Sequence, residues 1–492
     1  MRPRTLPPRL RGWLELLEGR AGLVIAVAAG VALRLAYVVA VAGTRLSDDE
    51  TSFWAIAGNV AHGRGYTYLG KATAWRPPLY TGLLAGARWL GASIRDVQLV
   101  QAVVGAATVA LLFAATRELT HSRRAAILAA WVGAVYPPFV YFAGRMLSEN
   151  VAIPLYVLAL WVSVIWLERR GTTWAALCGL SWGAAILGRP TALPVAALCV
   201  VIGAIGVSTS RRGARAVVEA GLVLLVIAAV MAPWVARNAS SVGGPEPITS
   251  NEGFALWSAN RLDDSQLKSV NDDVRYPGMQ DYAVYGRAFP GIEPLARAKG
   301  FDFDTASEAS QDDFFRKLAT HDIESDPLRF VTRTAERAVF VLLPAPDNAS
   351  QTAKTGRVAK VVLWMTSGPL MMLGIIGLAV LTLRERRNAI AWFLTLSAVG
   401  SLLLVATHVP DVRYRVDGVD PILVISGSWL VVEGLRRVRH ELPGSAQGAA
   451  GTPPRSTSYW RSGASHGCRP VGGPAAGSPS QRIAPVGAYW RM

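Results

Sequence analysis

Long apolar stretches, separated by short polar segments, repeat along most of this chain. The first, 21–43, is almost wholly apolar and can cross a bilayer, because about 20 helical residues span its hydrocarbon core. Two shorter stretches meet at Gly188-Arg189-Pro190, where proline ends one helix and can open the next. The pattern predicts an all-α polytopic membrane protein with about ten transmembrane helices. They cover 21–43, 98–116, 125–143, 147–167, 173–188, 190–207, 216–236, 358–383, 388–407 and 420–435.

The composition agrees with a membrane protein. Of the 492 residues, 51% are hydrophobic and 17% are charged, and the mean hydropathy is +0.31. The net charge of +16 does not indicate a nucleic-acid partner, because the arginines lie in short loops between apolar stretches and form no basic domain or known motif. The three cysteines, Cys178, Cys199 and Cys468, lack metal-ligand spacing, and we expect inert thiols.

The basic loops predict how the chain is oriented. Short cytoplasmic loops of membrane proteins are enriched in Lys and Arg. With the N-terminus inside, every short basic loop faces the cytoplasm, whereas the opposite orientation places all of them outside. We therefore predict a multi-pass protein of the plasma membrane with both termini in the cytoplasm. The loops contain Arg117, Arg123, Arg124, Arg169, Arg170, Arg211, Arg212, Arg215, Arg384, Arg386, Arg387, Arg436, Arg437 and Arg439.

The spans divide the chain into five regions. These are a cytoplasmic N-terminus (1–20), a membrane core with an external loop at 44–97 (21–236), an external insertion (237–356), C-terminal membrane helices (357–436) and a cytoplasmic tail (437–492). The tail is rich in Gly, Pro and Ser, and its composition predicts disorder.

The insertion differs from the rest of the chain in composition. Residues 237–354 contain 18 acidic and 13 basic residues, so the segment is net negative. Its aromatic and alternating apolar positions predict a small mixed domain. Its end, 327–343, has the pattern of an amphipathic helix, which suits a membrane surface.

Three consecutive acidic residues, Asp48, Asp49 and Glu50, directly follow the first span. Carboxylates at a membrane surface are costly to keep unless they are paired or functional. One alternative is structural, with Ser47 or Asp48 capping a helix. The other is catalytic: a carboxylate here could take a proton from an acceptor hydroxyl, or hold a divalent cation that neutralises a phosphate.

Two further polar positions lie on the same predicted side. In Trp75-Arg76-Pro77-Pro78-Leu79-Tyr80, the prolines fix an extended entry into a helix, and Arg76 could bind a phosphate with two parallel hydrogen bonds. A turn with a snorkelling arginine explains the segment equally well. Glu149 opens the fourth span and either faces a shared cavity with Asp49 or pairs with Arg145 at i−4.

Three external arginines go against the positive-inside bias. Arg189 lies between the two short spans, and Arg413 and Arg415 precede the last span. Arginines on this side are candidates for binding a lipid phosphate. The structural alternative is pairing with nearby acids, namely Asp411, Asp417 and Asp420.

The motifs, taken in order, resemble a known superfamily. No Walker loop, dinucleotide fingerprint, zinc spacing or nucleophile elbow is present. The order of the motifs across 21–435 resembles a bacterial GT-C glycosyltransferase of the family 39 type, related to protein O-mannosyltransferases and lipid A aminoarabinose transferases. The motifs are Asp48-Asp49-Glu50, Gly63-Arg64-Gly65-Tyr66, Arg76-Pro77-Pro78-Leu79-Tyr80, Leu147-Ser148-Glu149-Asn150, Gly188-Arg189-Pro190-Thr191, Ala232-Pro233-Trp234, Asn251-Glu252-Gly253 and Arg413-Tyr414-Arg415.

The resemblance carries expectations about function. It implies a polyprenyl-phosphate-linked sugar as donor and transfer to an acceptor on the external membrane face, and it leaves the acceptor and the metal requirement open. It implies that Asp49 or its neighbour Asp48 is the catalytic acid, with Phe53 where the family usually has Tyr. The expected donor-phosphate or substrate-binding residues are Arg76, Tyr80, Glu149, Arg189, Arg413 and Arg415.

Two other classes of protein could share these spans. A transporter or lipid flippase would carry charges at the bilayer midplane and show two symmetric halves. Here the unusual charges lie at the predicted external ends of the helices and the halves are unlike, which favours the transferase. A non-catalytic cell-envelope assembly protein that keeps the fold is the third possibility, and only an activity measurement excludes it.

Overall fold

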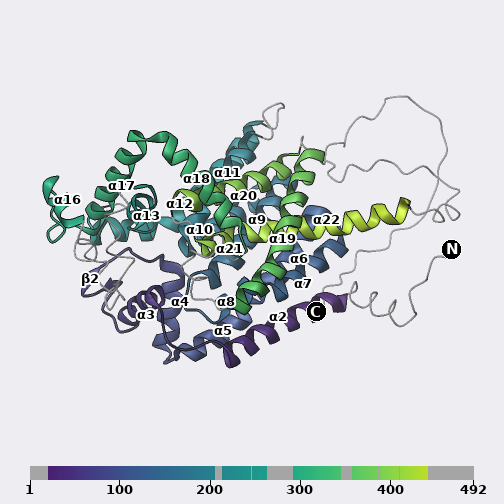
Figure 1. The fold of residues 1–492 in the computed structure, drawn as a ribbon, viewed down its shortest axis with the longest axis horizontal. Coiled ribbons are helices and arrows are strands. Elements are labelled where there is room, and N and C mark those ends of the chain that lie inside the picture. The colour runs from purple at the N-terminus through teal and green to yellow at the C-terminus, as the bar shows by residue number, and fades with distance from the viewer. Residues whose placement is uncertain are drawn as a thin grey trace, which may run out of the picture.

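The chain folds as a helical membrane protein with a helical insertion at one end (Figure 1). The computed structural model describes residues 20–205, 213–244, 246–262, 292–344, 357–385, 388–408 and 411–441. The N-terminal part comprises α2 (Arg20–Ala40), α3 (Asp48–Ala61), β1 (Thr67–Tyr68), β2 (Lys71–Ala72), α4 (Pro78–Trp89), α5 (Ile94–Gly105), α6 (Ala107–Thr120), α7 (Arg123–Val135), α8 (Pro137–Ala143), α9 (Glu149–Arg169), α10 (Thr172–Gly188), η1 (Pro190–Ala192), α11 (Leu193–Ile205) and α12 (Gly213–Ser241). The remainder comprises α13 (Glu252–Asn260), α16 (Ile292–Ala298), α17 (Glu308–Ser325), α18 (Pro327–Leu342), α19 (Arg357–Arg384), α20 (Ala389–Thr407), η3 (Val412–Tyr414), α21 (Arg415–Gly418) and α22 (Asp420–Glu441).

Helices form at all ten segments where spans are expected. Six helical stretches in the described residues are long and apolar enough to cross a membrane: α2, α5 with α6, α9, α12, α19 and α20. The pair α7 and α8 is bent by 49° and makes a seventh span if it crosses as one unit. The helices at 172–188 and 190–205 are apolar but shorter. The expected all-α polytopic fold is confirmed.

A buried arginine explains how the bend between α7 and α8 is tolerated. Pro137 and Pro138 have no amide hydrogen, so the carbonyls of Gly133 and Ala134 lose their helical donors. Arg34 of α2, which is fully buried, donates to both carbonyls at 3.1 and 3.2 Å. A charge inside a membrane span is costly unless it is paired. Here it satisfies two backbone groups that the prolines leave without partners.

The described residues of the insertion form helices and no strand, which differs from the mixed domain expected from the sequence. The apolar residues of α17 recur with helical spacing and pack with Trp257 and Phe303 into a separate aromatic core. Helices α13 and α17 cross closely at Gly253, where a Cβ atom would lie 2.1 Å from the carbonyl oxygen of Asp312. The short hairpin of β1 and β2 belongs instead to the 44–97 loop, with Thr67 opposite Ala72.

The insertion is attached to the 44–97 loop by polar contacts. The Glu308 carboxylate accepts hydrogen bonds from the Ala74 amide at 2.7 Å and the Thr73 hydroxyl at 3.2 Å. Arg237 donates to the carbonyls of Thr73 and Tyr66, at 2.6 and 2.8 Å. In Figure 1, α13, α16 and α17 accordingly lie at the same end of the molecule as α3, α4 and β2. The insertion therefore fixes the segment that leads into α4.

The amphipathic helix expected at 327–343 forms as α18 and packs against α20. It exposes Leu328 and Val339, which are 73% and 65% accessible. Apolar side chains on one exposed face suit a membrane surface, and this location stays a prediction.

The expectation of inert thiols holds for two of the three cysteines. Cys178 and Cys199 are free and buried, with their sulfur atoms 4.0 Å apart. Cys468 and the rest of the expected tail beyond Glu441 lie outside the described residues, as does the segment 1–19.

The orientation can be tested with two exposed positions at opposite ends. In a Cys468→Ser background, Thr305→Cys in the insertion should react with a membrane-impermeant thiol reagent in intact cells. Thr173→Cys, in the first turn of α10, should react only after the cells are permeabilised. Labelling of Thr173→Cys alone in intact cells would reverse the topology.

Candidate active site

The N-terminus of α3 holds one acid of the cluster in a structural role. Ser47 is the N-cap, and Glu50 at the third position completes a capping box by accepting from the Ser47 amide at 2.8 Å. Glu50 also pairs with Arg145 at 2.9 Å and accepts from the Met146 amide at 2.8 Å. Glu50 is 2% exposed. Its contacts favour the capping alternative, and they fasten α3 to the segment that precedes α9.

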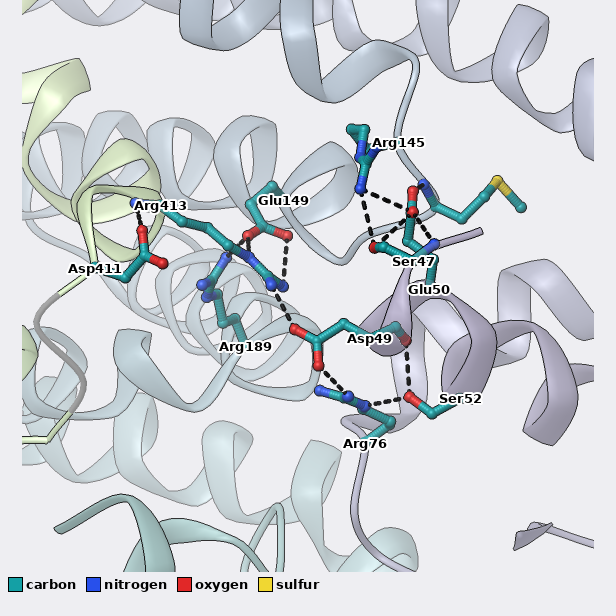
Figure 2. Close-up of polar contacts among 11 residues, drawn as sticks. Ser47, Asp49, Glu50, Ser52, Arg76, Arg145, Glu149, Arg189, Asp411 and Arg413 are labelled. Carbon is teal, nitrogen blue, oxygen red and sulfur yellow. Dashed lines mark hydrogen bonds and ion pairs between the residues drawn. The ribbon is translucent and has the colours of Figure 1, made fainter. Parts of the chain in front are cut away.

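Asp49 lies between two arginines that come from distant parts of the chain (Figure 2). Its carboxylate oxygens are 2.5 Å from Arg76 and 2.5 Å from Arg413. Burial alone would raise the pKa of Asp49, but the charges and hydrogen bonds of the two arginines outweigh it and hold that pKa well below the usual range. Asp49 is therefore ionised at physiological pH. The side chain of its neighbour Asp48 lies outside the described residues.

A second, deeper carboxylate shares Arg413 with Asp49. Glu149, the first residue of α9, is fully buried and pairs with Arg413 and, at 2.9 Å, with Arg189. Arg189 also lies 3.5 Å from Asp417, which accepts a hydrogen bond from Thr191 at 3.0 Å. The i−4 pairing of Glu149 with Arg145 does not form, because residues 144–148 are not helical.

The network is balanced in charge and opens toward solvent at one end. It has three carboxylates and three arginines: Asp49, Glu149, Asp417, Arg76, Arg189 and Arg413. The Asp49 side chain is 35% exposed, whereas those of the two deeper carboxylates are at most 2% exposed. Asp49 is therefore the most accessible member of the network, since the side chains of Arg76 and Arg413 are 12% and 7% exposed.

Aromatic rings and a hydroxyl orient the arginines. The Arg76 guanidinium lies 5.0 Å from the Phe53 ring centroid and donates to the Ser52 hydroxyl at 2.7 Å. The Arg189 guanidinium lies 4.6 Å from the ring of Tyr414. Cation–π contacts of this kind hold a guanidinium without using up its hydrogen-bond donors. The motifs Asp49-Glu50 with Phe53 and Arg413-Tyr414 thus meet in space.

Two of the predicted donor-phosphate or substrate-binding residues, Tyr80 and Arg415, lie apart from this network. The Tyr80 hydroxyl is buried and donates to Gln101 at 2.5 Å. Arg415 pairs with Asp420 at 3.1 Å and donates to the carbonyls of Val341 and Leu343, which is the structural alternative. Sequence reasoning missed Ser52 and Gln101. A polar residue inside a predicted span was the available signal for Gln101, whereas nothing marked Ser52.

The described part of the Asp49 network consists of arginines and carboxylates that pair with one another. Among them, no group of three or more His, Cys, Asp or Glu side chains could hold a metal ion. Both carboxylate oxygens of Asp49 already face guanidinium groups. The Asp48 side chain lies outside the described residues, and the divalent cation considered for the acid cluster stays a prediction.

Comparison with known proteins supports the resemblance seen in the motifs. Residues 76–236, about a third of the chain, match the family model described as dolichyl-phosphate-mannose-protein mannosyltransferase. No curated protein matches the chain. The match begins at Arg76, so it contains Glu149 and Arg189 but neither Asp49 nor Arg413.

Solved structures share the fold at low sequence identity. The archaeal oligosaccharyltransferase AglB from Archaeoglobus fulgidus, in complex with an inhibitory peptide and a dolichol-phosphate, matches with a TM-score of 0.51, 16% identity, and coverage of 85% of this chain and 51% of that chain. An oligosaccharyltransferase from the same organism, tethered with an acceptor peptide, gives a TM-score of 0.53, 16% identity, and coverage of 87% and 51%. ArnT from Cupriavidus metallidurans bound to undecaprenyl phosphate gives only 0.38 at 15% identity, covering 86% and 81%.

The two oligosaccharyltransferase structures establish the fold type. The chain spans about half the length of the oligosaccharyltransferase chains it matches. The membrane core has the fold of the GT-C glycosyltransferases, as the motifs predict, and the chain is a multi-pass membrane protein.

The network predicts a large and specific loss of stability when Arg413 is removed. Arg413→Ala leaves the fully buried Glu149 with Arg189 as its remaining ion-pair partner, and breaking such a buried pair typically costs about 3–5 kcal/mol. We expect a marked drop in the melting temperature of the detergent-purified protein. Arg384→Ala removes a half-exposed pair with Glu433 and should cost at most about 1 kcal/mol. Equal melting temperatures for the two variants would contradict the network.

Proposed function

We propose that this protein is a membrane glycosyltransferase that moves a sugar from a polyprenyl-phosphate-linked donor to an acceptor on the external face of the plasma membrane. The observation that carries the proposal is the placement of Asp49. It is the accessible carboxylate of a charge network whose deeper members are buried, and two arginines hold it. A reactive carboxylate beside phosphate-binding groups is the arrangement that such a transfer needs.

The arginines would bind the donor phosphate. A guanidinium has five donors in a planar fork, so Arg76 and Arg413 can keep contact with Asp49 and still donate to a phosphate oxygen. Their positive charge would stabilise the lipid phosphate as it leaves. The family description names a dolichyl-phosphate-mannose donor, and one matching oligosaccharyltransferase is in complex with a dolichol-phosphate, which supports a donor of this class.

Asp49 would activate the acceptor. Its lowered pKa makes it a weak base as long as both arginines face it. When the donor phosphate draws these guanidinium groups toward itself, the carboxylate loses part of their field and its pKa rises. It can then accept the proton of the acceptor hydroxyl as that oxygen attacks the anomeric carbon. The bond to the phosphate breaks in the same displacement, with inversion at that carbon.

The position of the charges argues against a transporter or lipid flippase. Asp49 opens α3, Glu149 opens α9, Arg189 follows α10, and Arg413 lies between α20 and α22. A transporter would hold such groups near the bilayer midplane. The only described arginine buried within the first span, Arg34, is bound to backbone carbonyls.

The proposal is tested by replacing the accessible carboxylate. Asp49→Asn keeps the size of the side chain and removes its charge, so sugar transfer should fall on the order of a hundredfold or more. The measurement is glycan composition by mass spectrometry in a deletion strain complemented with each variant, together with protein level. Asp48→Asn, one residue away, is the matched control. Parental transfer by both single variants and by the double variant would refute the proposal.

The two arginines that contact Asp49 should differ from Arg415 in their effect on donor use. Lysine keeps the charge but cannot make two parallel hydrogen bonds, so Arg76→Lys and Arg413→Lys should raise KM for the lipid-linked donor about tenfold. Arg415→Lys alters contacts with backbone carbonyls and Asp420, so it should lower the melting temperature and leave KM unchanged. A larger increase in KM for Arg415→Lys than for Arg76→Lys and Arg413→Lys would indicate that Arg415 binds the donor phosphate.

A further inference from the structure

The insertion contains a cavity that shares no residue with the Asp49 network. It has a volume of about 700 Å³ and lies between the turn at 243–247, the N-terminus of α13 and the first half of α17. Carboxylates, phenyl rings and two cations line it. The residues that matter for its chemistry are Glu246, Glu252, Phe301, Phe314, Arg316 and Lys317.

The cations of this cavity are already paired. Arg316 forms an ion pair with the buried Asp312 at 2.8 Å and lies 4.0 Å from Asp313. Lys317 pairs with Asp313 at 2.8 Å. Asp312 also accepts hydrogen bonds from the amides at the start of α13, which fixes it in place. Arg316 also acts through space on Glu246 and Glu252, but in the part of the chain that the structure describes neither glutamate forms an ion pair with it.

Glu246 and Glu252 are the remaining carboxylates of the cavity lining. Glu246 is 7% exposed, and among the described residues neither side chain has a hydrogen-bond or ion-pair partner. Burial, and then the charge of Asp312, raises the pKa of Glu246 to about 7. Burial likewise raises the pKa of Glu252. A carboxylate in this situation is unfavourable unless a cation meets it.

We propose that this cavity binds a small molecule or headgroup that carries a protonated amine. The ammonium group would lie against the carboxylates of Glu246 and Glu252, which offer several acceptor positions to its three donors. The carbon skeleton would pack on Phe301 and Phe314, whose rings stack with centroids 4.4 Å apart and form an apolar wall. A phenyl face also attracts a cation directly. The ligand therefore combines a positive amine with a compact apolar or ring-shaped body.

The inference goes beyond sugar transfer and does not depend on it. The cavity binds a ligand through residues of α13, α17 and the 243–247 turn, whereas the proposed transfer uses Asp49 and its arginines. A binding measurement without donor or acceptor therefore tests the cavity alone.

The experiment compares amines with their neutral N-acetyl counterparts. Full-length protein in detergent is titrated at about pH 7 with glucosamine and with ethanolamine, which represent a sugar amine and a lipid headgroup amine. Binding is followed by saturation-transfer NMR. We expect at least one amine to bind at least tenfold more tightly than its N-acetyl form. The preferred amine identifies the source, a sugar for glucosamine and a headgroup for ethanolamine.

Matched variants locate the binding. Glu246→Gln and Glu252→Gln should each weaken amine binding about tenfold, because each removes one negative charge from the cavity. Glu324→Gln changes an exposed glutamate near the end of α17, outside the cavity, and should bind like the parent. Circular dichroism and melting temperature confirm that the variants fold. The proposal is overturned if neither amine is preferred over its acetylated form, or if the preference survives in the Glu246→Gln/Glu252→Gln double variant.

Discussion

The ion pairs that Arg413 makes with Asp49 and Glu149 connect three segments of the membrane core that are far apart in the sequence. The three residues lie on the loop after the first span, at the start of α9, and in the connection between α20 and α22. Neither Arg413 nor Glu149 could remain buried alone, because burying an unpaired ion is far more costly than burying a paired one. The pairing therefore holds three distant segments together, and it does so where the substrate would enter.

The insertion adds a second constraint on the same place. Glu308 and Arg237 bind the backbone of the segment that precedes Arg76, and Arg76 in turn contacts Asp49. The position of Asp49 is thus set from two sides, by the membrane helices through Arg413 and by the insertion through the 66–76 segment. Preorganisation of this kind lets a charged group act without first being rearranged.

Much of the fold and most residues of the Asp49 network could be predicted from the sequence, because hydropathy and charge placement act locally. The spans follow from apolar length, and Asp49, Arg76, Glu149, Arg189 and Arg413 stand out as charges that a membrane protein would otherwise avoid. Pairing of Arg189 with Asp417 and of Arg415 with Asp420 was among the expected alternatives. The pairing of Asp49 with Arg76 and Arg413 could not be predicted, because it depends on contacts between distant segments. Arg145 illustrates this: it reaches Glu50 rather than Glu149, since the helix is interrupted between them. The helices in the described part of the insertion were not predicted for a related reason, because short apolar runs fit strands and helices alike.

The equality of positive and negative charges in the Asp49 network bears on how a turnover would end. A sugar-phosphate diester brings one negative charge to three arginines that three carboxylates already neutralise. After transfer, the lipid phosphate that remains is a monoester, whose second ionisation near pH 6 gives it close to two negative charges. Once Asp49 has passed the acceptor proton on to solvent, the site with the spent carrier would hold about one more negative charge than the site with the loaded carrier. Repulsion from Asp49 and Glu149 would favour its departure, so the same carboxylates that position the arginines would also clear the site for the next donor.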